Sequence, residues 1–368
     1  MRFPEFTEEW KSKTIDEIFE LRNGYTPSKA NNTFWDGGTI PWFRMEDIRQ
    51  NGGVLYDAIQ HITPEAVKGS GLFEPYSIIL ATTATIGEHA MLIADSLANQ
   101  RFTNLKVHKS LTHKYDPYYL YYYFFGIDRW CLKNTNAGGL LSVDIPSLKR
   151  KQIYAPLLNE QKKIAKLFII LDDRIATQIK IIEDLKTLKS AISSKVFTLM
   201  SDYKTVKLGN LCTITTGKLD ANAMTEDGQY MFFTCSKENN KTDTFAFEGK
   251  ALLIAGNGEI GNVKYYDGKF NAYQRTYVLQ NFSENIKYLQ FYIEHFLPQR
   301  ILKEKNVGAM PYIVLSTLAD MPVHLPNNTL KRNIAHLLQT IDDKISLEIN
   351  VLELFYQQKQ FLLQQMFI

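Results

Sequence analysis

Regularly spaced apolar positions occupy the middle of the chain, from Glu160 to Leu199. They recur at alternating steps of four and three, and no Pro or Gly interrupts them. This spacing is typical of a heptad seam and predicts a helix about 60 Å long that packs against another helix. The seam positions are Ile164, Phe168, Leu171, Ile175, Gln178, Ile182, Leu185, Lys189, Ile192 and Val196.

The same pattern recurs 170 residues later, where the polar interruptions fall at equivalent seam positions. Gln178 corresponds to Glu348, and Lys189 corresponds to Lys359. Two unrelated amphipathic helices would not share these interruptions, so we predict a duplicated helix whose two copies pair as an antiparallel coiled coil. The second seam consists of Ile334, Leu338, Ile341, Ile345, Glu348, Leu352, Phe355, Lys359, Leu362 and Met366.

A mixed globular segment precedes each long helix. In the first, the pattern predicts an aromatic-rich helix over residues 117–125 and a polar loop over 134–139. The expected strands cover residues 39–44, 77–82, 104–108 and 152–154. The second segment repeats the order, because Gly217 corresponds to Gly24 and Gln274-Arg275 corresponds to Gln100-Arg101.

The predicted fold class is therefore α+β, with two related α/β globules separated by two long helices. The offset between the copies falls from 193 residues at Gly24 to 170 at the helices, so the second copy is shorter by 23 residues. Paired antiparallel, the helices would relate the globules by a pseudo-two-fold axis and act as a spacer between two binding modules.

Composition narrows the function classes. The 368 residues are 45% hydrophobic with a net charge of +3, so any nucleic-acid surface must be local. Three cysteines without a CxxC pair, and seven histidines without ligand spacing, favour neither a disulfide framework nor a metal site. No apolar run is long enough to span a bilayer, and no signal-peptide pattern is present. We expect a soluble cytoplasmic protein.

One segment, Gly256 to Gly261, reads literally as GxGxxG. A dinucleotide or methyl-donor site would need a helix to begin within the motif, so that its N-terminus faces phosphate. The residues that follow predict a short strand ending at Asp267-Gly268 instead. We therefore favour a hairpin or a bulge at this position.

Acidic pairs occur on both long helices, at Asp172-Asp173 and Asp342-Asp343. Neighbouring residues on a helix point about 100° apart, so these pairs are poorly placed to share a metal ion and are better explained as solvated faces or salt bridges. No Ser/His/Asp or Cys/His arrangement stands out. We expect no catalytic site in this chain.

Candidate nucleic-acid contacts are amide, hydroxyl and basic side chains on loops beside aromatic residues. Arg and Lys bind phosphates or guanine edges, and Asn and Gln bind adenine. If the globules read different sequences, base contacts should lie among residues that differ between the copies. The candidates are Tyr25, Thr26, Ser28, Lys29, Arg44, Gln100, Arg101, Lys133 and Asn136 in the first copy, and Lys218, Thr234, Lys237, Gln274, Arg275, Lys305 and Asn306 in the second.

The whole chain resembles the specificity (S) subunits of type I restriction–modification systems. The resemblance depends on the duplicated globule and helix, and on Gly24 to Ser28, Ile40 to Trp42 and Gln100-Arg101. The most specific stretch begins at Pro156, continues through Glu160-Gln161 and Ile164-Ala165, and reaches Leu171-Asp172. In the second copy, residues 328–333 replace the Glu-Gln stretch and Ile341 replaces the leucine.

The resemblance implies two target-recognition domains, residues 1–155 and 201–325, and two conserved helices, residues 156–200 and 326–368. Each domain would read half of a bipartite double-stranded DNA site, and the helices would set the gap. The helices would also dock two methyltransferase (M) subunits, through which restriction (R) subunits attach. S-adenosylmethionine, Mg²⁺ and ATP would belong to those partners. No cofactor, metal or membrane is expected for this chain.

Two other interpretations remain open at this point. The chain could be a free-standing nucleotide- or methyl-donor-binding enzyme that uses Gly256 to Gly261. It could also be a coiled-coil adaptor whose globules bind protein rather than DNA.

Overall fold

The structure is a computed structural model that describes residues 2–136, 141–238, 240–304 and 312–367. Its contacts divide the chain into two compact units. Unit 1 contains residues 1–177 and 352–368, and unit 2 contains residues 178–351. Both units include part of helix α6 (Leu158–Thr198) and part of helix α9 (Asn328–Met366), so each combines a globule with a pair of helical segments.

The globule of unit 1 is built on a five-stranded sheet of order β2-β9-β6-β7-β4. Alternate residues of its central strand face opposite sides, as the pleat requires. Ile78 and Leu80 join the core beneath the helices, whereas Ile79 and Ala81 join a second core on the other face. The strands are β2 (Phe19–Asn23), β9 (Phe102–Val107), β6 (Ile78–Ala81), β7 (His89–Leu92) and β4 (Val54–Leu55).

A smaller sheet of order β5-β3-β8 covers the second core of unit 1. It contains β5 (His61–Ile62), β3 (Ile40–Phe43) and β8 (Leu97–Ala98). Two strand pairs lie outside both sheets: β1 (Lys11–Thr14) with β12 (Gln152–Ala155), and β10 (Thr135–Asn136) with β11 (Ser142–Val143). The loop predicted over 134–139 thus begins with a short strand, and its residues 137–139 lie outside the described part of the chain.

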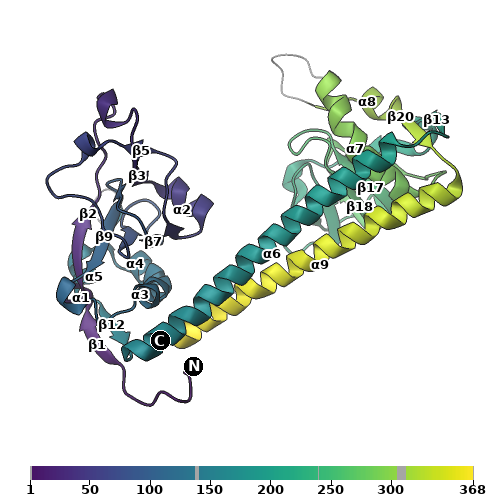
Figure 1. Cartoon of the computed structure of the whole chain (residues 1–368). Helices are drawn as coiled ribbons and strands as arrows, with labels where there is room; N and C mark the ends of the chain where they lie inside the picture. The colour runs from purple at the N-terminus through teal and green to yellow at the C-terminus, as the bar shows by residue number, and fades with distance from the viewer. Residues whose placement is uncertain (1, 137–140, 239, 305–311, 368) are drawn as a thin grey trace. The chain divides into compact units, whose positions relative to one another are not determined.

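Five short α-helices complete the described part of unit 1 (Figure 1). The predicted aromatic helix forms, and its side chains Tyr119 and Tyr122 are buried against the first turns of α6. Asp116 begins this helix by accepting a hydrogen bond from the Tyr119 amide at 3.0 Å, which satisfies one free N–H of the first turn. The helices are α1 (Ile15–Ile18), α2 (Met45–Asn51), α3 (Pro117–Tyr123), α4 (Ile127–Lys133) and α5 (Ile145–Arg150).

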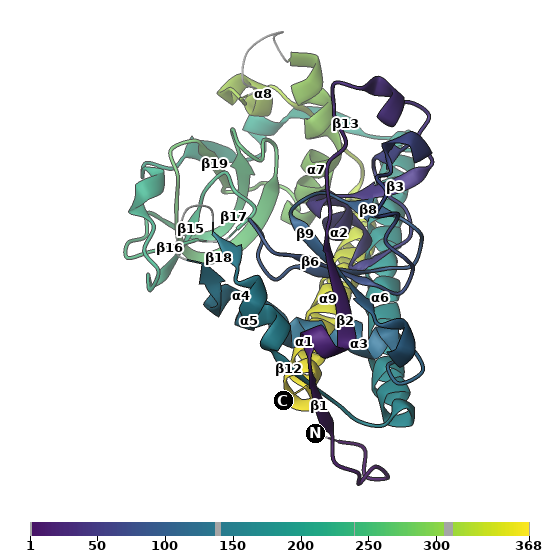
Figure 2. The ribbon, with the colours of Figure 1, turned by 90° about the vertical axis from the view of Figure 1, so that its left-hand side faces the viewer.

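Unit 2 has one six-stranded sheet of order β14-β19-β17-β18-β15-β16. Figure 2 labels its strands β15 to β19. Leu252 and Ile254 of the central strand face the helices, and Ala251 and Leu253 face the opposite core. The strands are β14 (Thr213–Thr216), β15 (Tyr230–Phe233), β16 (Asn240–Thr242), β17 (Phe247–Ala255), β18 (Val263–Ala272) and β19 (Thr276–Gln280). Around them lie β13 (Lys204–Lys207), β20 (Pro322–Leu325), α7 (Ile286–Glu304) and α8 (Leu315–Ala319).

Equivalent hydrogen bonds in the two units confirm the duplication predicted from the sequence. Gly24 donates its N–H to the Phe102 carbonyl at 2.9 Å, and Gly217 donates to the Thr276 carbonyl at 3.1 Å. Both glycines lie so close to the neighbouring backbone that a Cβ would collide with it. Glycine is therefore needed at both positions for close approach, not only for turning the chain.

In each unit a segment of α6 packs against a segment of α9, running antiparallel (Figure 1). In unit 1, Asp172 of α6 pairs with Lys359 of α9 at 2.5 Å. In unit 2, Lys189 of α6 pairs with Asp342 of α9 at 2.7 Å. These two ion pairs are equivalents under the 170-residue repeat. The predicted fold class, with two related globules and long helices paired as a coiled coil, is confirmed.

The predicted helix-pairing residues lie in this arrangement with different degrees of burial. Ile164, Phe168, Leu171, Ile175, Ile182, Ile334, Leu338 and Ile345 are buried. Leu185, Ile192, Ile341, Leu352, Phe355 and Leu362 are half-buried. The buried polar interruption pairs with its own repeat: the Gln178 side-chain amide donates to the Glu348 carboxylate at 2.5 Å. A buried amide satisfied in this way can fix the register of a coiled coil.

Candidate nucleic-acid interface

The candidate residues Gln100 and Arg101 form an exposed turn between β8 and β9 of unit 1. The Arg101 carbonyl accepts a hydrogen bond from the Thr82 N–H at 2.9 Å, and the Arg101 amide donates to the Asn99 side chain at 2.9 Å. The Thr26 hydroxyl donates to the side-chain carbonyl of Gln100. The backbone is thus fixed while the Arg101 side chain projects outward, which suits contact with a phosphate or a base edge.

Tyr25 supports this turn from within. Its hydroxyl donates to the Ala66 carbonyl at 3.1 Å and accepts from the Lys68 amide at 2.8 Å, and its carbonyl accepts from the Trp42 indole at 3.0 Å. A half-buried phenol with both functions satisfied has little left to offer a ligand. Tyr25 therefore positions the loop, while Ser28 and Lys29 beyond it are exposed.

The other candidates of unit 1 lie on separate elements. Arg44 precedes α2, and its Nε lies 3.9 Å from a carboxylate oxygen of Glu46. Its amide donates to the buried Asp47 at 2.6 Å. Lys133 ends α4 and Asn136 lies in β10, and both side chains are exposed.

Unit 2 repeats the Gln–Arg turn between β18 and β19, where Gln274 and Arg275 are both exposed. The Arg275 carbonyl accepts from the Gly256 N–H at 2.9 Å, which is the counterpart of the bond from Thr82 to Arg101. In both units, therefore, the Gln and Arg side chains extend from a turn whose arginine carbonyl is fixed by an equivalent backbone hydrogen bond. This recurrence, made of long-range contacts, is the strongest geometric feature of the candidate interface.

The remaining candidates of unit 2 are less uniform. Thr234 is hydrogen-bonded to Ser236 at 2.9 Å and to Asn240 at 3.2 Å, so its hydroxyl serves the local loop. Lys237 is 79% exposed with Glu259 at 3.4 Å, and Lys218 is also exposed. Two further candidates, Lys305 and Asn306, lie outside the described residues.

The GxGxxG segment is a hairpin turn, the first of the two structures predicted for it. It joins β17 to β18, which pair antiparallel up to Ile254 and Val263. Gly261, at φ +78°, donates to the Ala255 carbonyl at 2.8 Å, and Gly87 makes the same bond to Ala81 in unit 1. A strand follows the motif, so it provides no helix N-terminus of the kind that binds pyrophosphate.

The two copies of the Pro-Glu-Gln region begin their helices by different means. In unit 1, Glu160 is buried and accepts two hydrogen bonds from Arg2, each 2.7 Å. Buried Gln161 donates to the carbonyls of Lys114 and Pro156 at 3.0 and 2.8 Å. In unit 2 the counterpart of Gln161 is Lys331, which forms a salt bridge with Glu284. The motif thus anchors α6 to its globule.

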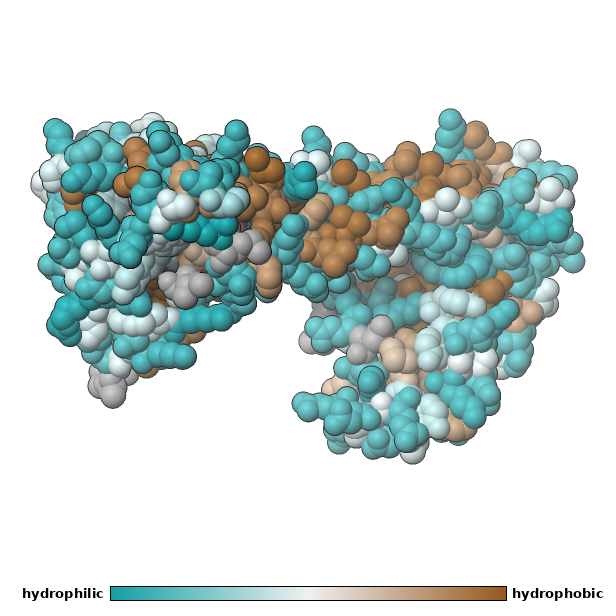
Figure 3. Space-filling view, turned by 90° about the horizontal axis from the view of Figure 1, so that it is seen from below, coloured by the Kyte–Doolittle hydropathy of each residue, from teal (hydrophilic) through white to brown (hydrophobic). Residues whose placement is uncertain are grey.

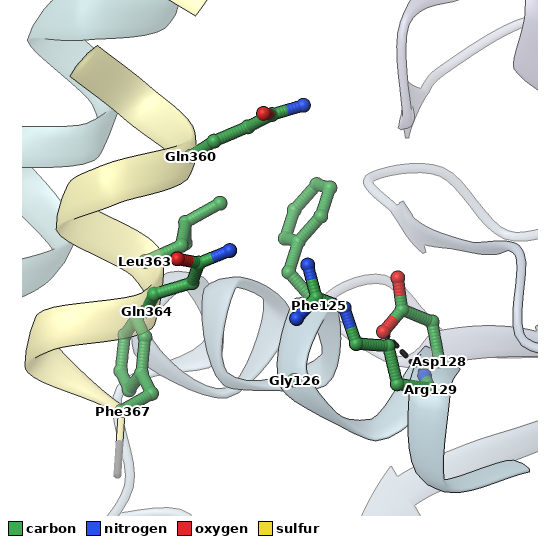
Figure 4. Close-up of a pocket in the computed structure, with 8 residues that line it drawn as sticks. All are labelled: Phe125, Gly126, Asp128, Arg129, Gln360, Leu363, Gln364 and Phe367. Atoms are coloured by element: carbon green, nitrogen blue, oxygen red, sulfur yellow. Dashed lines mark hydrogen bonds between the residues drawn. The ribbon is translucent and has the colours of Figure 1, made fainter. Parts of the chain in front are cut away.

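A cavity lies in unit 1 between α4 and the last turns of α9 (Figure 4). Phe367 lies on its α9 side and Gly126 opposite. The counterpart of Phe367 in unit 2 is Phe197, which is buried against the His295 and Phe296 rings at 5.4 and 5.7 Å between centroids. His295 occupies the position of Gly126 in the repeat, so the missing ring at Gly126 leaves the space open.

Buried ionisable groups support a structural role for the interior. Burial raises the thiol pKa of Cys131 and of Cys212 to about 12, which leaves both unreactive as nucleophiles. Burial also lowers the pKa of Lys189, but the adjacent carboxylates of Glu294 and Asp342 outweigh it and raise the pKa overall.

Among the described residues, no group of three His, Cys, Asp or Glu side chains could hold a metal ion. The helices in the described ranges also include none with the length and apolarity to cross a bilayer.

Comparison with known proteins gives the family. The family model described as the type I restriction modification DNA specificity domain matches residues 7–187 and again residues 200–354. The chain belongs to this specificity-domain family. Its two matches correspond to the two copies of the repeat.

Relatives in the specificity-domain family include the type I restriction enzyme EcoprrI specificity subunit of Escherichia coli, 46% identical over 149 residues. That match covers 40% of this chain and 37% of the relative. The EcoDI specificity subunit, also of Escherichia coli, is 41% identical over 38% of this chain and 31% of its own length. The match thus spans about a third of each of these relatives. The MjaIX specificity subunit of Methanocaldococcus jannaschii is 23% identical over 92% of this chain and 88% of its own.

Solved structures show the same fold. The S subunit of a type I restriction-modification system from M. genitalium aligns over 100% of this chain and 99% of its own, with a TM-score of 0.61 and 17% identity. A chain from a structure on complex assembly and conformational transition of the type I R-M system aligns over 99% and 98%, with a TM-score of 0.62 and 14% identity.

Sequence reasoning missed residues that line the surface beside each Gln–Arg turn. In unit 2 these include Thr216, Tyr277 and Tyr312, which border a cavity shared with Gln274 and Arg275. The available signal was the repeat itself, because these positions differ between the copies whereas Gln–Arg does not. Only the fold shows that Thr216 and Tyr312 lie next to the turn, since β14 and the segment before α8 are far from it in sequence, whereas Tyr277 follows Arg275 by two residues.

Proposed function

We propose that this chain is the DNA-recognition subunit of a type I restriction–modification complex, and that each globule reads one half of a bipartite double-stranded site. The observation that carries the proposal is the Gln–Arg turn, presented twice with an equivalent backbone hydrogen bond by two related globules. Arg and Gln side chains held on a fixed backbone can make bidentate contacts with base edges. The family membership gives independent support.

The chain provides recognition and leaves the chemistry to other subunits. The interior thiols of Cys131 and Cys212 are unreactive, and the GxGxxG segment is a hairpin turn. We propose that S-adenosylmethionine, Mg²⁺ and ATP bind to partner subunits: two methyltransferase subunits that contact this chain, and restriction subunits that attach through them. A cytoplasmic location accords with such a complex.

The long helices suit both the docking and the spacing role. In unit 1, α9 exposes Leu354 and Phe361, and in unit 2 it exposes Leu337 and Leu347; Figure 3 shows apolar residues reaching the surface. Exposed apolar groups gathered on one element favour an interface with another protein. We propose that methyltransferase subunits dock on these helices. A helix of 41 residues is about 60 Å long, enough to separate half-sites by at least one turn of DNA.

The test is methylome sequencing of host cells with the chain present, deleted, and restored. We expect one bipartite motif to be methylated only when the chain is present. Removing residues 11–155 should abolish recognition of one half-site while the methyltransferase subunits still co-purify. If the restored chain binds S-adenosylmethionine stoichiometrically by itself, or if methylation is unchanged by the deletion, the proposal fails.

Inserting seven residues into both long helices tests the spacing role separately. One heptad keeps the seam in register and adds about 10 Å. The tolerated gap between half-sites should lengthen while both half-site sequences stay the same. A change in the half-site sequences would show that the helices take part in reading DNA.

A further inference from the structure

A cavity of about 390 Å³ opens beside the Gln274–Arg275 turn of unit 2. Gly256 provides part of its wall, because a Cβ there would lie 2.5 Å from the Arg275 carbonyl oxygen and 3.2 Å from the Tyr277 ring. The Tyr277 hydroxyl donates to the Ile313 carbonyl at 2.9 Å, and the Ile313 N–H donates to the Gly256 carbonyl at 2.8 Å. The wall is therefore held in place by one side-chain and one backbone hydrogen bond, while Tyr312, which also lines the cavity, is 65% exposed.

The same place in unit 1 has the same backbone. Thr82 donates to the Arg101 carbonyl at 2.9 Å and accepts from the Val143 N–H at 2.9 Å. These bonds identify Thr82 as the counterpart of Gly256, and Val143 as the counterpart of Ile313. By the same register, Ser142 stands where unit 2 has Tyr312.

The side chains at this place nevertheless differ, because unit 2 has aromatic rings and bare backbone at positions where unit 1 has small polar side chains. In unit 1 the Thr103 hydroxyl donates to the side-chain carbonyl of Asn23 at 2.9 Å, and the Thr82 hydroxyl lies 3.4 Å from that of Thr103. The residues Asn23, Thr82, Thr103 and Ser142 thus present hydroxyl and amide groups. Their counterparts in unit 2 are Thr216, Gly256, Tyr277 and Tyr312, so one threonine remains and the other three positions carry bare backbone and two aromatic rings, of which Tyr277 already has its hydroxyl bonded to Ile313.

We propose that this place beside the Gln–Arg turn is where the two units differ in the base pair they accept, and that the cavity of unit 2 takes the 5-methyl group of a thymine. This inference depends on the DNA-recognition function proposed above. The Gln–Arg pair is common to both units, so it cannot by itself distinguish two half-sites. Of the groups on base edges in the major groove, only the thymine methyl is apolar, and Thr methyl groups and aromatic rings are its usual contacts.

The experiment uses the chain in complex with the methyltransferase subunits of its host, and DNA carrying the motif found by methylome sequencing. Each thymine in the half-site read by unit 2 is replaced singly by uracil, which removes the methyl group alone. One replacement should weaken binding about fourfold, the effect of losing one buried methyl group. Replacements in the half-site read by unit 1 serve as the comparison.

Two variants connect the effect to the cavity. Tyr312→Ser and Thr216→Asn install the unit 1 residues at exposed positions, so folding should be retained. Each should reduce the thymine-over-uracil preference toward one while leaving the half-site of unit 1 unchanged. Lys250→Ala is the matched control, since it lies on β17 about 20 Å along the strand from Gly256 and should keep the full preference.

The inference is overturned if every uracil replacement in that half-site binds like thymine, if the half-site contains no A·T pair, or if both variants keep the wild-type preference. Failure of the proposed function looks different: the complex would then show no sequence-specific binding to any DNA. Arg275→Ala separates the two further, because it should weaken binding to the thymine and the uracil DNA alike.

Discussion

The two units share a backbone design but differ in how completely their strands are formed. In unit 2, β17 and β18 run unbroken through nine and ten residues. In unit 1 the matching stretch of β18 is divided into β7 and β8, separated by residues 93–96. Unit 1 also contains α2 and β4, which occupy part of the 23 residues by which it is longer. The Gln–Arg turn survives these changes, because the bond that both units share, from the Thr82 or Gly256 N–H to the arginine carbonyl, involves only main-chain atoms.

The paired segments of α6 and α9 also keep a common feature, an Asp–Lys ion pair, while its neighbours differ between the units. Both units pair an Asp with a Lys across the coil, but the third group differs. In unit 1, Asp172 also accepts from the Tyr122 hydroxyl at 2.8 Å, and in unit 2, Lys189 also binds Glu294 at 3.1 Å. A neutral donor supports the carboxylate in one unit, and a second carboxylate supports the amine in the other. The repeat thus preserves the ion pair and varies its surroundings.

The largest difference between the units should appear on truncating the equivalent phenylalanines. Phe197→Ala should destabilise unit 2 by about 3–5 kcal/mol, because the ring is fully packed. Phe367→Ala should cost about 1–2 kcal/mol, since one side of that ring already faces the cavity shown in Figure 4. Urea unfolding of each variant measures both values. Equal losses would show that the cavity does not loosen the packing at Phe367.

The next difference concerns the stability of the two units at acidic pH. His89 is buried in unit 1, and burial lowers its pKa to about 4, below the ordinary value near 6.5. The unfolded chain binds the proton first, so this group stabilises unit 1 fully above about pH 6.5 and loses that effect as pH falls toward 4. The total loss is on the order of 3 kcal/mol. Val263 stands at this position in unit 2.

Unfolding in urea between pH 7 and pH 4 tests this prediction, with His89→Gln as the matched variant. The variant should lack the part of the acid sensitivity that comes from His89, although it starts less stable at pH 7. If wild type and variant lose stability in parallel over this range, His89 is not the group responsible.

Replacing the coil lysines should separate the units by a smaller amount. Lys189→Met leaves the carboxylates of Glu294 and Asp342 facing each other, and we expect a cost of about 2 kcal/mol. Lys359→Met leaves one carboxylate that still accepts from Tyr122, so the cost should be nearer 1 kcal/mol. A double-mutant cycle of Lys189→Met with Asp342→Asn measures the coupling. No coupling would mean that the pair is screened by solvent.

The smallest predicted difference between the units is in DNA affinity, because the two equivalent arginines should have similar effects. Arg101→Ala and Arg275→Ala should each weaken specific binding by about 1–3 kcal/mol if the side chain contacts a base, and each should relax only its own half-site. Lys106→Ala and Lys250→Ala remove a charge further along the adjoining strands and should change affinity by less. Fluorescence anisotropy with the complex measures all four. Unchanged affinity in a folded Arg variant would remove that residue from the interface.

Several features could be predicted from the sequence because they depend on local pattern. The heptad spacing fixed the two long helices to within two residues at the start of α6 and one at its end, since apolar seams and the absence of Pro and Gly decide helix extent. The turn at Gly256 to Gly261 was predicted from the strand-like residues that follow it. The acidic pairs Asp172-Asp173 and Asp342-Asp343 were predicted to be solvated faces or salt bridges, and the structure shows that Asp172 and Asp342 each pair with a lysine of the other long helix.

The sequence by itself therefore determined the duplication, the paired helices and the repeated Gln–Arg turn. Each of these depends on residues that are close together in the chain or that recur at a constant offset. Only the tertiary structure showed that the Tyr25 hydroxyl is already hydrogen-bonded within unit 1, and that Thr216, Gly256 and Tyr312 lie together beside Arg275. Those contacts join segments separated by tens of residues. Their proximity depends on which strands pair with each other. Hydrophobic periodicity predicts which face of a strand is buried, but not which strand lies beside it.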